Sequence, residues 1–328
     1  MSQARLDPAP GGAGRAPRLW IVSPIYFDVE AYTLLLARLR AVTFALPSQP
    51  PLAVSFVAVD DSAGLDPEVR TLEGLPGVRV IVPPFNLGHQ RALVHGLRRL
   101  AAEIDDADLV VTADADGEDQ PEDLPRLLAE LLAEPGNQRR IALAARTRRR
   151  ETLAFKVLYF FFKHFFLLLS GTVVRSGNFA AYRGWVARNV LFHPHFELCY
   201  ASSLLSLNLN IVRVPCERGA RYAGVSKMTY GKLVLHGLRM LMPFGDQIAG
   251  RGFVLSAFLL ALDVLALVAT ALASLWSGAA IPVPWACALL AGFALSWVSL
   301  LASVVLFALF SQSQALSMDR LREGARAQ

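Results

Sequence analysis

Cysteine is scarce in this chain of 328 residues, which contains three: Cys199, Cys216 and Cys287. They form no close pair and show none of the spacings of a metal-binding cysteine cluster. A disulfide framework is therefore not expected, and the scarcity suits a reducing compartment.

Two common phosphate-binding motifs are also absent. The sequence contains no Gly-x-Gly-x-x-Gly and no Gly-Lys-Ser/Thr, which disfavours dinucleotide-binding and P-loop enzymes. The isoelectric point is about 9.3, but no aromatic and basic RNA-binding motif accompanies it. We expect no nucleic acid partner, because the basic residues gather near apolar segments and better suit anionic lipid headgroups and phosphorylated substrates.

Charge is almost missing from the C-terminal part, where Asp263 is the only charged side chain between Gly252 and Met318. The apolar segments Phe253–Trp276 and Trp285–Phe310 are each long enough to cross a hydrocarbon core of about 30 Å as a helix. Two buried core helices are the alternative interpretation. The pattern predicts a transmembrane hairpin, and Asp263 within it should face a partner helix, a neighbouring subunit or a polar cavity.

The orientation of this hairpin follows from the flanking arginines. Arg239 and Arg251 precede the first segment, whereas Arg320, Arg322 and Arg326 follow the second, and the connecting loop has no basic residue. The positive-inside rule therefore places both ends and the N-terminal domain on the cytoplasmic side of a multi-pass inner-membrane protein. Residues 1–17 lack the apolar core of a signal peptide and are expected to be a disordered tail.

Strand and helix patterns alternate through the first half, which predicts an α/β domain with a mostly parallel, Rossmann-like sheet covered on both faces. The expected strands are Leu19–Val22, Ala53–Val59, Val78–Val82, Leu109–Val111 and Ile141–Ala145. The expected helices are Glu30–Phe44, His89–Glu103 and Glu122–Glu134.

Polar side chains follow three of these strands. They are Tyr26 and Asp28, Asp60 and Asp61, and Asp114 and Asp116 with the nearby Glu118. Ligands of such sheets bind at the carboxyl ends of the strands, and carboxylates in this position suit Mg²⁺ or Mn²⁺. A solvated acidic loop, and a turn or helix cap at Asp60 and Asp61, are the alternatives. Because three strands end in such polar residues at once, the sequence favours a nucleotide site.

Five segments together resemble the family 2 glycosyltransferases with a GT-A fold, specifically the polyprenol-phosphate sugar transferases. The matching segments are Pro24–Asp28, Val59–Ser62, the Asn86–Leu93 loop and helix, Asp114–Glu118 and Arg221–Lys227. Phe27 and Asp28 depart from the family's Pro-x-Tyr-Asn-Glu, Val59–Ser62 lacks a spacer residue, and Glu118 replaces the usual Gln.

The resemblance implies a metal-dependent, inverting transfer of a sugar from a UDP- or GDP-linked donor to a polyprenyl phosphate such as undecaprenyl phosphate. It implies Mg²⁺ or Mn²⁺ held by Asp114, Asp116 and Glu118, where the metal would act as a Lewis acid on the leaving diphosphate. The implied donor-binding residues are Pro24, Tyr26, Asp28, Asp60, Asp61, Asn86, Gly88 and Asp114.

The acceptor phosphate is already anionic near pH 7, so positioning by cations matters more than a general base. The candidates for this role are Arg146, Lys156, Arg218, Arg221 and Lys227. We expect Asp114, Asp116, Lys227 and Arg146 to carry catalysis, and Lys227 is the strongest of the cations. Asn178 stands where relatives carry the acid of Gly-Asp-Phe, and His89 and His95 are interpreted as helix-surface residues.

Two more segments suit a lipid acceptor. Residues 153–169 are aromatic with interspersed Lys156, Lys163 and His164, which predicts an interfacial helix, with a buried core helix as the alternative. Thr229–Phe244 is a second amphipathic candidate.

The expected organisation is a GT-A domain over 18–228, a juxtamembrane helix over 229–251, the hairpin over 252–311 and a cytosolic tail over 312–328, in a homo-oligomer. Another membrane-bound acceptor is the alternative within enzymes, and an inactive membrane scaffold and a small transporter are alternatives of other classes.

Overall fold

The computed structural model describes residues 15–42, 52–146, 153–173, 176–222 and 230–326. The chain divides into two compact units. The first comprises Met1–Val157 with Val174–Pro243, and the second comprises Leu158–Val173 with Phe244–Gln328. The expected domain limits differ from this division, because most of the 153–169 helix groups with the C-terminal helices.

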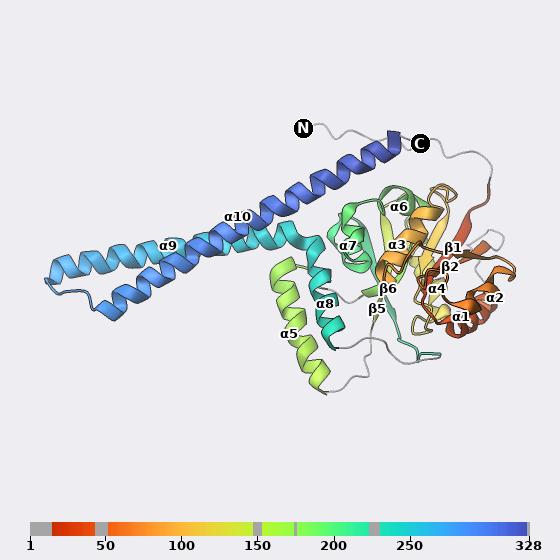
Figure 1. Cartoon of the computed structure of the whole chain (residues 1–328), viewed down its shortest axis with the longest axis horizontal. Helices are drawn as coiled ribbons and strands as arrows, with labels where there is room; N and C mark the ends of the chain where they lie inside the picture. The colour runs from red at the N-terminus through yellow and green to blue at the C-terminus, as the bar shows by residue number, and fades with distance from the viewer. Residues whose placement is uncertain (1–14, 43–51, 147–152, 174–175, 223–229, 327–328) are drawn as a thin grey trace. The chain divides into compact units, whose positions relative to one another are not determined.

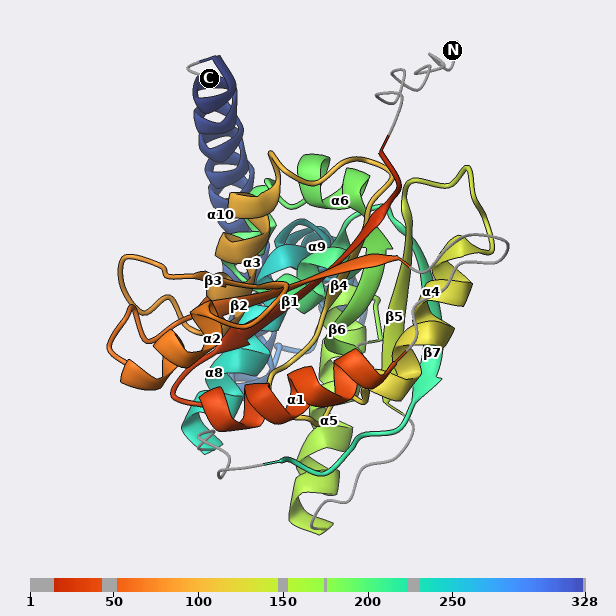
Figure 2. The same cartoon turned by 90° about the vertical axis from the view of Figure 1, so that its right-hand side faces the viewer.

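The first unit is built on a seven-stranded sheet with the order β3-β2-β1-β4-β6-β5-β7 (Figure 2). Neighbouring strands are parallel except that β6 runs antiparallel to both β4 and β5. The predicted α/β class with a mostly parallel sheet is confirmed. The strands are β1 (Arg18–Ile25), β2 (Ala53–Asp60), β3 (Val78–Ile81), β4 (Leu109–Thr112), β5 (Arg140–Arg146), β6 (Ser176–Arg183) and β7 (Asn210–Cys216).

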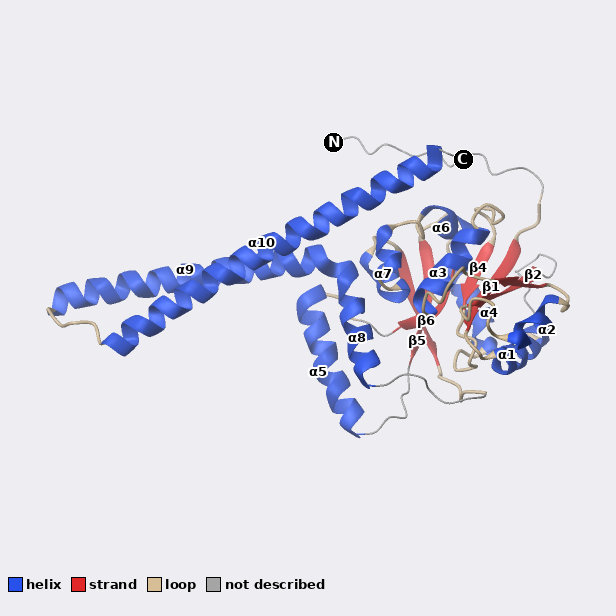
Figure 3. Ribbon diagram, in the orientation of Figure 1, coloured by secondary structure: helices blue, strands red, loops and turns tan. Residues whose placement is uncertain are grey.

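Helices cover both faces of this sheet (Figure 3). In β1, Leu19 and Ile21 pack into one core, whereas Trp20 and Val22 pack into the other, as the alternation of side chains along a strand requires. The first core is closed by α1 (Val29–Ala41), α2 (Arg70–Glu73) and α4 (Leu124–Leu132), the second by α3 (His89–Leu100), α6 (Gly184–Asn189) and α7 (Tyr200–Ser206). The helix α8 (Tyr230–Leu241) also lies in this unit. The short 3₁₀ helices of the chain are Pro67–Val69, Pro121–Asp123, Pro194–Glu197 and Met242–Phe244.

Several segments that contain predicted site residues lie at one edge of the sheet. The parallel strands β2, β1 and β4 end there, and β6 begins there because it runs the other way. Ala145, near the end of β5, lies opposite Ser176, and Arg146 lies opposite Cys216 at the end of β7. With β3, which runs parallel to β2, seven strand ends therefore meet at the edge where ligands of such sheets bind.

The second unit contains most of α5 (Leu153–Ser170), together with α9 (Gly245–Ser277) and α10 (Val283–Arg326), the long helices in Figure 1. Val234–Ser277 and Val283–Phe310 are long and apolar enough to cross a membrane, as the sequence predicts. Ser296 donates to Asp263 Oδ2 at 2.6 Å, so Asp263 faces a partner helix, one of the three expected environments.

The described part of α5 presents several aromatic side chains to the outside. Phe160, Phe161 and Phe165 are exposed, whereas Phe166 is buried and packs edge-on against Phe244. This mixture fits a helix with one open apolar face better than a fully buried core helix. Its interfacial role stays a prediction.

Candidate active site

The loop that follows β4 carries three half-buried carboxylates, with 19% exposure for the side chain of Asp114 and 16% for those of Asp116 and Glu118. The loop is held by its own backbone. Asp114 N donates to Asp119 Oδ2 and Glu118 N donates to Asp116 Oδ1, both at 3.0 Å. We call residues 114–119 the acidic loop.

Asp114 is fixed by residues from two other elements. His89 Nε2 lies 2.9 Å from Asp114 Oδ1, and Asn178 Nδ2 donates to the same oxygen at 3.0 Å. Gln90 Nε2 donates to Asn178 Oδ1 at 2.7 Å, and Gln90 Oε1 accepts from Tyr200 N at 3.0 Å. The interpretation of His89 as an ordinary helix-surface residue overlooked this contact, because only the packing of α3 beside β6 creates it.

Asp116 and Glu118 pair with arginines from the segment after β7. Arg221 Nη2 lies 2.7 Å from Asp116 Oδ2, and Arg218 Nε donates to Glu118 Oε2 at 2.8 Å. Two of the five cations expected near the acceptor phosphate are therefore brought to the acidic loop. The extra negative charge that Glu118 brings in place of Gln is balanced by Arg218.

The crowding of charge changes two pKa values. Burial raises the pKa of Asp116, and the neighbouring carboxylates of Asp114 and Glu118 raise it further, against the opposing effects of the Glu118 N–H and Arg221. Desolvation would lower the pKa of His89, but the carboxylates of Asp114, Asp116 and Asp119 outweigh it and the pKa is raised. The site therefore favours bound positive charge.

The other expected donor residues fall into buried and exposed groups. Asp60 is fully buried and accepts from Ser62 N and Gly64 N at 3.0 Å, the turn-forming role that was the alternative at this position. Asp61 is buried as well and accepts from Leu87 N at 2.7 Å and from the Asn86 side chain at 3.3 Å. Both aspartates therefore shape the loops that carry the exposed groups.

The exposed members are Tyr26, Asn86 and Gly88, with Asp28 half-buried and Pro24 buried at the end of β1. Gly88 precedes α3 with a φ of +80°, a conformation that favours glycine. These residues follow β1 and β3 at the same edge as the acidic loop, as the sequence predicts. Their contacts with a nucleotide stay a prediction.

Three acceptor candidates are not placed by the described side chains. The backbone of Arg146 ends β5 at the correct edge of the sheet, and Lys156 lies within α5, but neither side chain is among those described. Lys227 lies in 223–229, outside the described residues.

The carboxylates fit a divalent cation only in part. Among the described residues, no group of three or more His, Cys, Asp or Glu side chains is arranged to hold a metal ion, so the expected trio of Asp114, Asp116 and Glu118 is not assembled. Mg²⁺ is often bound by one or two carboxylates and completed by substrate phosphates. The guanidinium of Arg221 already places positive charge on Asp116, so this carboxylate suits a cation.

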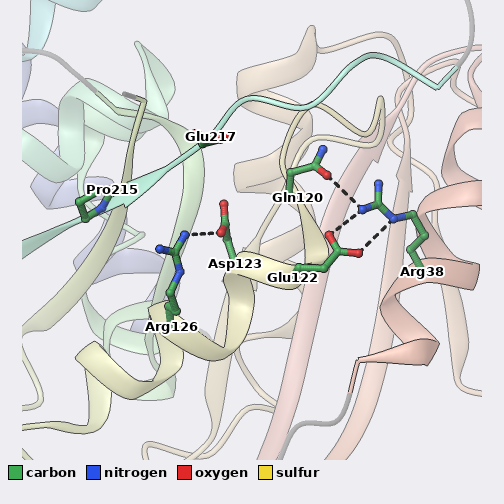
Figure 4. A pocket seen from close by; sticks show the side chains of 7 residues that line it. All are labelled: Arg38, Gln120, Glu122, Asp123, Arg126, Pro215 and Glu217. Atoms are coloured by element: carbon green, nitrogen blue, oxygen red, sulfur yellow. Dashed lines mark hydrogen bonds and ion pairs between the residues drawn. The ribbon is translucent and has the colours of Figure 1, made fainter. Parts of the chain in front are cut away.

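A polar pocket of about 710 Å³ lies beside the acidic loop (Figure 4). Arg38 crosses it, with Nη2 2.6 Å from Glu122 and 3.0 Å from Gln120, while Nη1 donates to the Tyr222 hydroxyl at 2.5 Å. Arg126 pairs with Asp123 on the pocket wall. Arg38 and Arg126 are therefore already paired within the protein. They stabilise the surroundings of the acidic loop and are not left to bind a phosphate in this pocket.

Comparison with known proteins decides the family, since residues 29–190 match the sequence model of glycosyl transferase family 2. Residues 29–190 form a domain of glycosyl transferase family 2. The match covers the strands and helices from α1 to α6, including the acidic loop, and confirms both the resemblance and the interpretation of the chain as a glycosyltransferase.

Two curated proteins are similar to this family 2 glycosyltransferase over most of their length. An undecaprenyl-phosphate 4-deoxy-4-formamido-L-arabinose transferase from Enterobacter sp. (strain 638) is 26% identical, with 74% of this chain and 76% of that protein covered. The protein of the same name from Klebsiella pneumoniae is 25% identical, with coverage of 74% and 75%. A solved structure, mannosyl-3-phosphoglycerate synthase from Rubrobacter xylanophilus, has a TM-score of 0.49 at 16% identity and covers 72% of this chain and 75% of its own.

Proposed function

We propose that this glycosyltransferase transfers a sugar from a nucleoside diphosphate to a polyprenyl phosphate, with inversion at the anomeric carbon. The observation that carries the proposal is the contact of Arg218 and Arg221 with the carboxylates of the acidic loop. It brings cations suited to phosphate and oxygen ligands suited to a divalent metal to one edge of the sheet. Similarity to two undecaprenyl-phosphate sugar transferases supports this acceptor.

The reaction exchanges one bond to the anomeric carbon for another. An oxygen of the acceptor phosphate forms the new bond while the bond to the β-phosphate oxygen of the donor breaks, and the nucleoside diphosphate leaves with the electron pair. A divalent ion, Mg²⁺ or Mn²⁺, held by Asp114 and Asp116 would supply Lewis-acid stabilisation of that leaving group.

The chain's own residues would orient both substrates. Asp61 and Asn86 hold the loops that would receive the nucleotide, and Tyr26 and Asp28 line the same edge. Arg221 and Arg218, with Lys227 and Arg146, would position the acceptor phosphate, which needs no strong base because it is already ionised near pH 7. We propose that Glu118 serves mainly to anchor Arg218.

The membrane arrangement is part of the proposal. Residues 18–228 would form the catalytic domain on the cytoplasmic side of the inner membrane, and α9 and α10 would anchor it as a hairpin. The described aromatic residues of α5 and the exposed apolar face of α8 (Val234, Leu235 and Leu238) suit a lipid interface. We expect a homo-oligomer.

Sugar transfer by the purified full-length protein tests the proposal. Undecaprenyl phosphate would be offered with UDP-glucose, GDP-mannose and a UDP-linked 4-deoxy-4-formamido-L-arabinose, in the presence of Mn²⁺ or Mg²⁺. We expect one donor to give a lipid-phosphate product that is lost on chelation and with Asp116→Ala. Asp106→Ala is the matched control, since Asp106 pairs with Arg188 at the opposite edge of the sheet.

Two other outcomes would replace the proposal. Binding of nucleotide and metal without product from any donor would favour a different membrane-bound acceptor. Absence of nucleotide binding would favour a scaffold that keeps the fold without catalysis.

A further inference from the structure

Residues 218–222, which we call the arginine strap, lie along the acidic loop. Gly219 N donates to the carbonyl oxygen of Glu118 at 2.8 Å, and Tyr222 N donates to that of Asp116 at 2.9 Å. These backbone hydrogen bonds join segments about a hundred positions apart in the chain. They place the strap next to the carboxylates independently of any side-chain charge.

Close packing holds the strap in this register. A Cβ on Gly117 would lie 2.3 Å from the ring of Tyr222, and one on Gly219 would lie 1.5 Å from Gln120 Nε2. The Tyr222 hydroxyl accepts from Arg38 at 2.5 Å. The strap therefore has anchors that do not involve Arg221, so the Arg221 side chain can change partner while the strap backbone stays.

The contact of Arg221 competes with metal binding. Its Nη2 lies 2.7 Å from Asp116 Oδ2 and 3.7 Å from Glu118 Oε1. A divalent ion that takes the same carboxylate oxygen binds it at about 2.0–2.1 Å for Mg²⁺. Two positive charges on one carboxylate oxygen repel each other at such a short separation, so each cation weakens the binding of the other at Asp116.

We propose that Arg221 is a positioning residue that occupies Asp116 in the absence of metal and is displaced onto the acceptor phosphate when metal and donor bind. The inference rests on the proposed function and adds a sequence of events to it. Once freed from Asp116, Arg221 would offer a bidentate phosphate donor within reach of the active site. Donor and metal would therefore bind before the acceptor is held productively.

Arg218 has a separate task in this arrangement. It pairs with Glu118, and both Nε and Nη2 contact the same oxygen. This pair keeps one carboxylate of the loop neutralised whether or not Arg221 has left. Arg218 should therefore stay in place when Arg221 is displaced.

The test is a measurement of Mn²⁺ binding to the full-length protein without nucleotide. The bound fraction is obtained from the decrease in the electron paramagnetic resonance signal of free Mn²⁺. Arg221→Gln removes the competing cation, and we expect Mn²⁺ to bind roughly tenfold more tightly, the effect of losing a partly buried ion pair. Arg221→Lys keeps the charge and should lie between the two. A residue with a merely structural role would weaken metal binding when removed.

Arg126→Gln is the matched control, because it removes the same charge from the Asp123 pair beside the pocket and should leave Mn²⁺ affinity unchanged. A second measurement follows the transfer reaction, in which Arg221→Gln should raise KM for undecaprenyl phosphate about tenfold or more and change KM for the donor little.

Each other result has a defined meaning. Equal or weaker Mn²⁺ binding by Arg221→Gln, an equal gain in Arg126→Gln, or an unchanged acceptor KM would each overturn the exchange. Absence of Mn²⁺ binding by the wild-type protein would overturn it together with the proposed metal dependence. If neither the wild type nor any variant transfers sugar to undecaprenyl phosphate, but Arg221→Gln still binds Mn²⁺ more tightly than the wild type, only the proposed acceptor chemistry would be overturned.

Discussion

Asn178 and Asp114, on β6 and in the acidic loop, are joined by a hydrogen bond of 3.0 Å from Nδ2 to Oδ1. Gln90 donates to Asn178 Oδ1, so the amide is oriented with its N–H toward Asp114. The antiparallel direction of β6 makes this contact possible, because Ala180 lies opposite Thr112 and the strand begins beside the acidic loop. In this chain, position 178 therefore presents a hydrogen-bond donor to Asp114.

Replacing Asn178 by Asp should therefore reduce transfer, although the resemblance described under the sequence analysis implies an acid at this position. Two carboxylates would face each other about 3 Å apart, and the hydrogen bond from the side-chain amide of position 178 to Asp114 would be lost. We expect kcat/KM for the donor to fall roughly 10- to 100-fold, as for other outer contacts of metal ligands. Steady-state kinetics with Asn189→Asp, an exposed position on α6, provide the control. Higher activity of Asn178→Asp would instead support a catalytic role for an acid at this position.

Much of the first unit follows from local sequence pattern. The apolar runs that end in Asp60 and in the acidic loop predict β2 and β4. The ends of all five expected strands agree with the structure to within about one residue, except that β1 continues past Val22 to Ile25. Because these strands are buried on both faces, their composition is unambiguous. The parallel order then brings their ends together, which is why the site could be located.

The second half of the sheet could not be predicted in the same way. Ser176–Arg183 contains Gly177 and Asn178, and Asn210–Cys216 contains Pro215. These residue types weaken a strand signal. The roles of His89 and Gln90 were missed for a related reason. Their partners lie on β6 and α7, and long-range packing alone brings them together.

Gly117→Ala should damage both the loop and the activity. Gly117 has a φ of +84°, and a Cβ there would lie 2.3 Å from the Tyr222 ring. The backbone conformation alone costs an alanine about 1–2 kcal/mol, and the overlap would also push the arginine strap away. We expect a lower melting temperature and a larger loss of transfer, measured by thermal unfolding and kinetics.

Gly136→Ala is the matched control for this prediction, because a Cβ there meets nothing within 4 Å and its φ is not in the left-handed region. Wild-type activity of Gly117→Ala would show that the strap does not need its observed position.

The stability of the first unit should depend on pH through Asp61. Burial raises the pKa of its carboxyl, and the N–H groups of Leu87 and Gly88 only partly oppose this effect. Because the folded pKa exceeds the unfolded one, the folded state holds the proton more tightly, and the charged form costs stability above the folded pKa. That cost decreases as the pH falls through the folded pKa toward the ordinary value.

Asp61→Asn keeps the shape without the charge. We therefore expect the melting temperature of the wild type, measured relative to this variant, to rise as the pH is lowered from neutrality through the raised pKa. A difference that is constant with pH, or one that falls, would mean that Asp61 is not the group responsible.

The hairpin of α9 and α10 should depend on the contact between Asp263 and Ser296. Ser296 Oγ donates to Asp263 Oδ2 at 2.6 Å, and Ser256 and Ser299 share a hydrogen bond of 2.7 Å farther along the same pair of helices. In a membrane such contacts are worth about 0.6 kcal/mol on average and at most about 1.7 kcal/mol. Ser296→Ala should therefore lower the unfolding free energy of the hairpin in bicelles by an amount in this range.

A double-mutant cycle with Asp263→Ala separates the pair from its surroundings, because the two substitutions together should cost less than their sum. Ser274→Ala is the control, since Ser274 donates to Ala279 O in the loop and not across the helices. Additive losses for Asp263→Ala and Ser296→Ala would mean that Asp263 stabilises the hairpin through another partner, and its position in the span would then have to be explained by that partner.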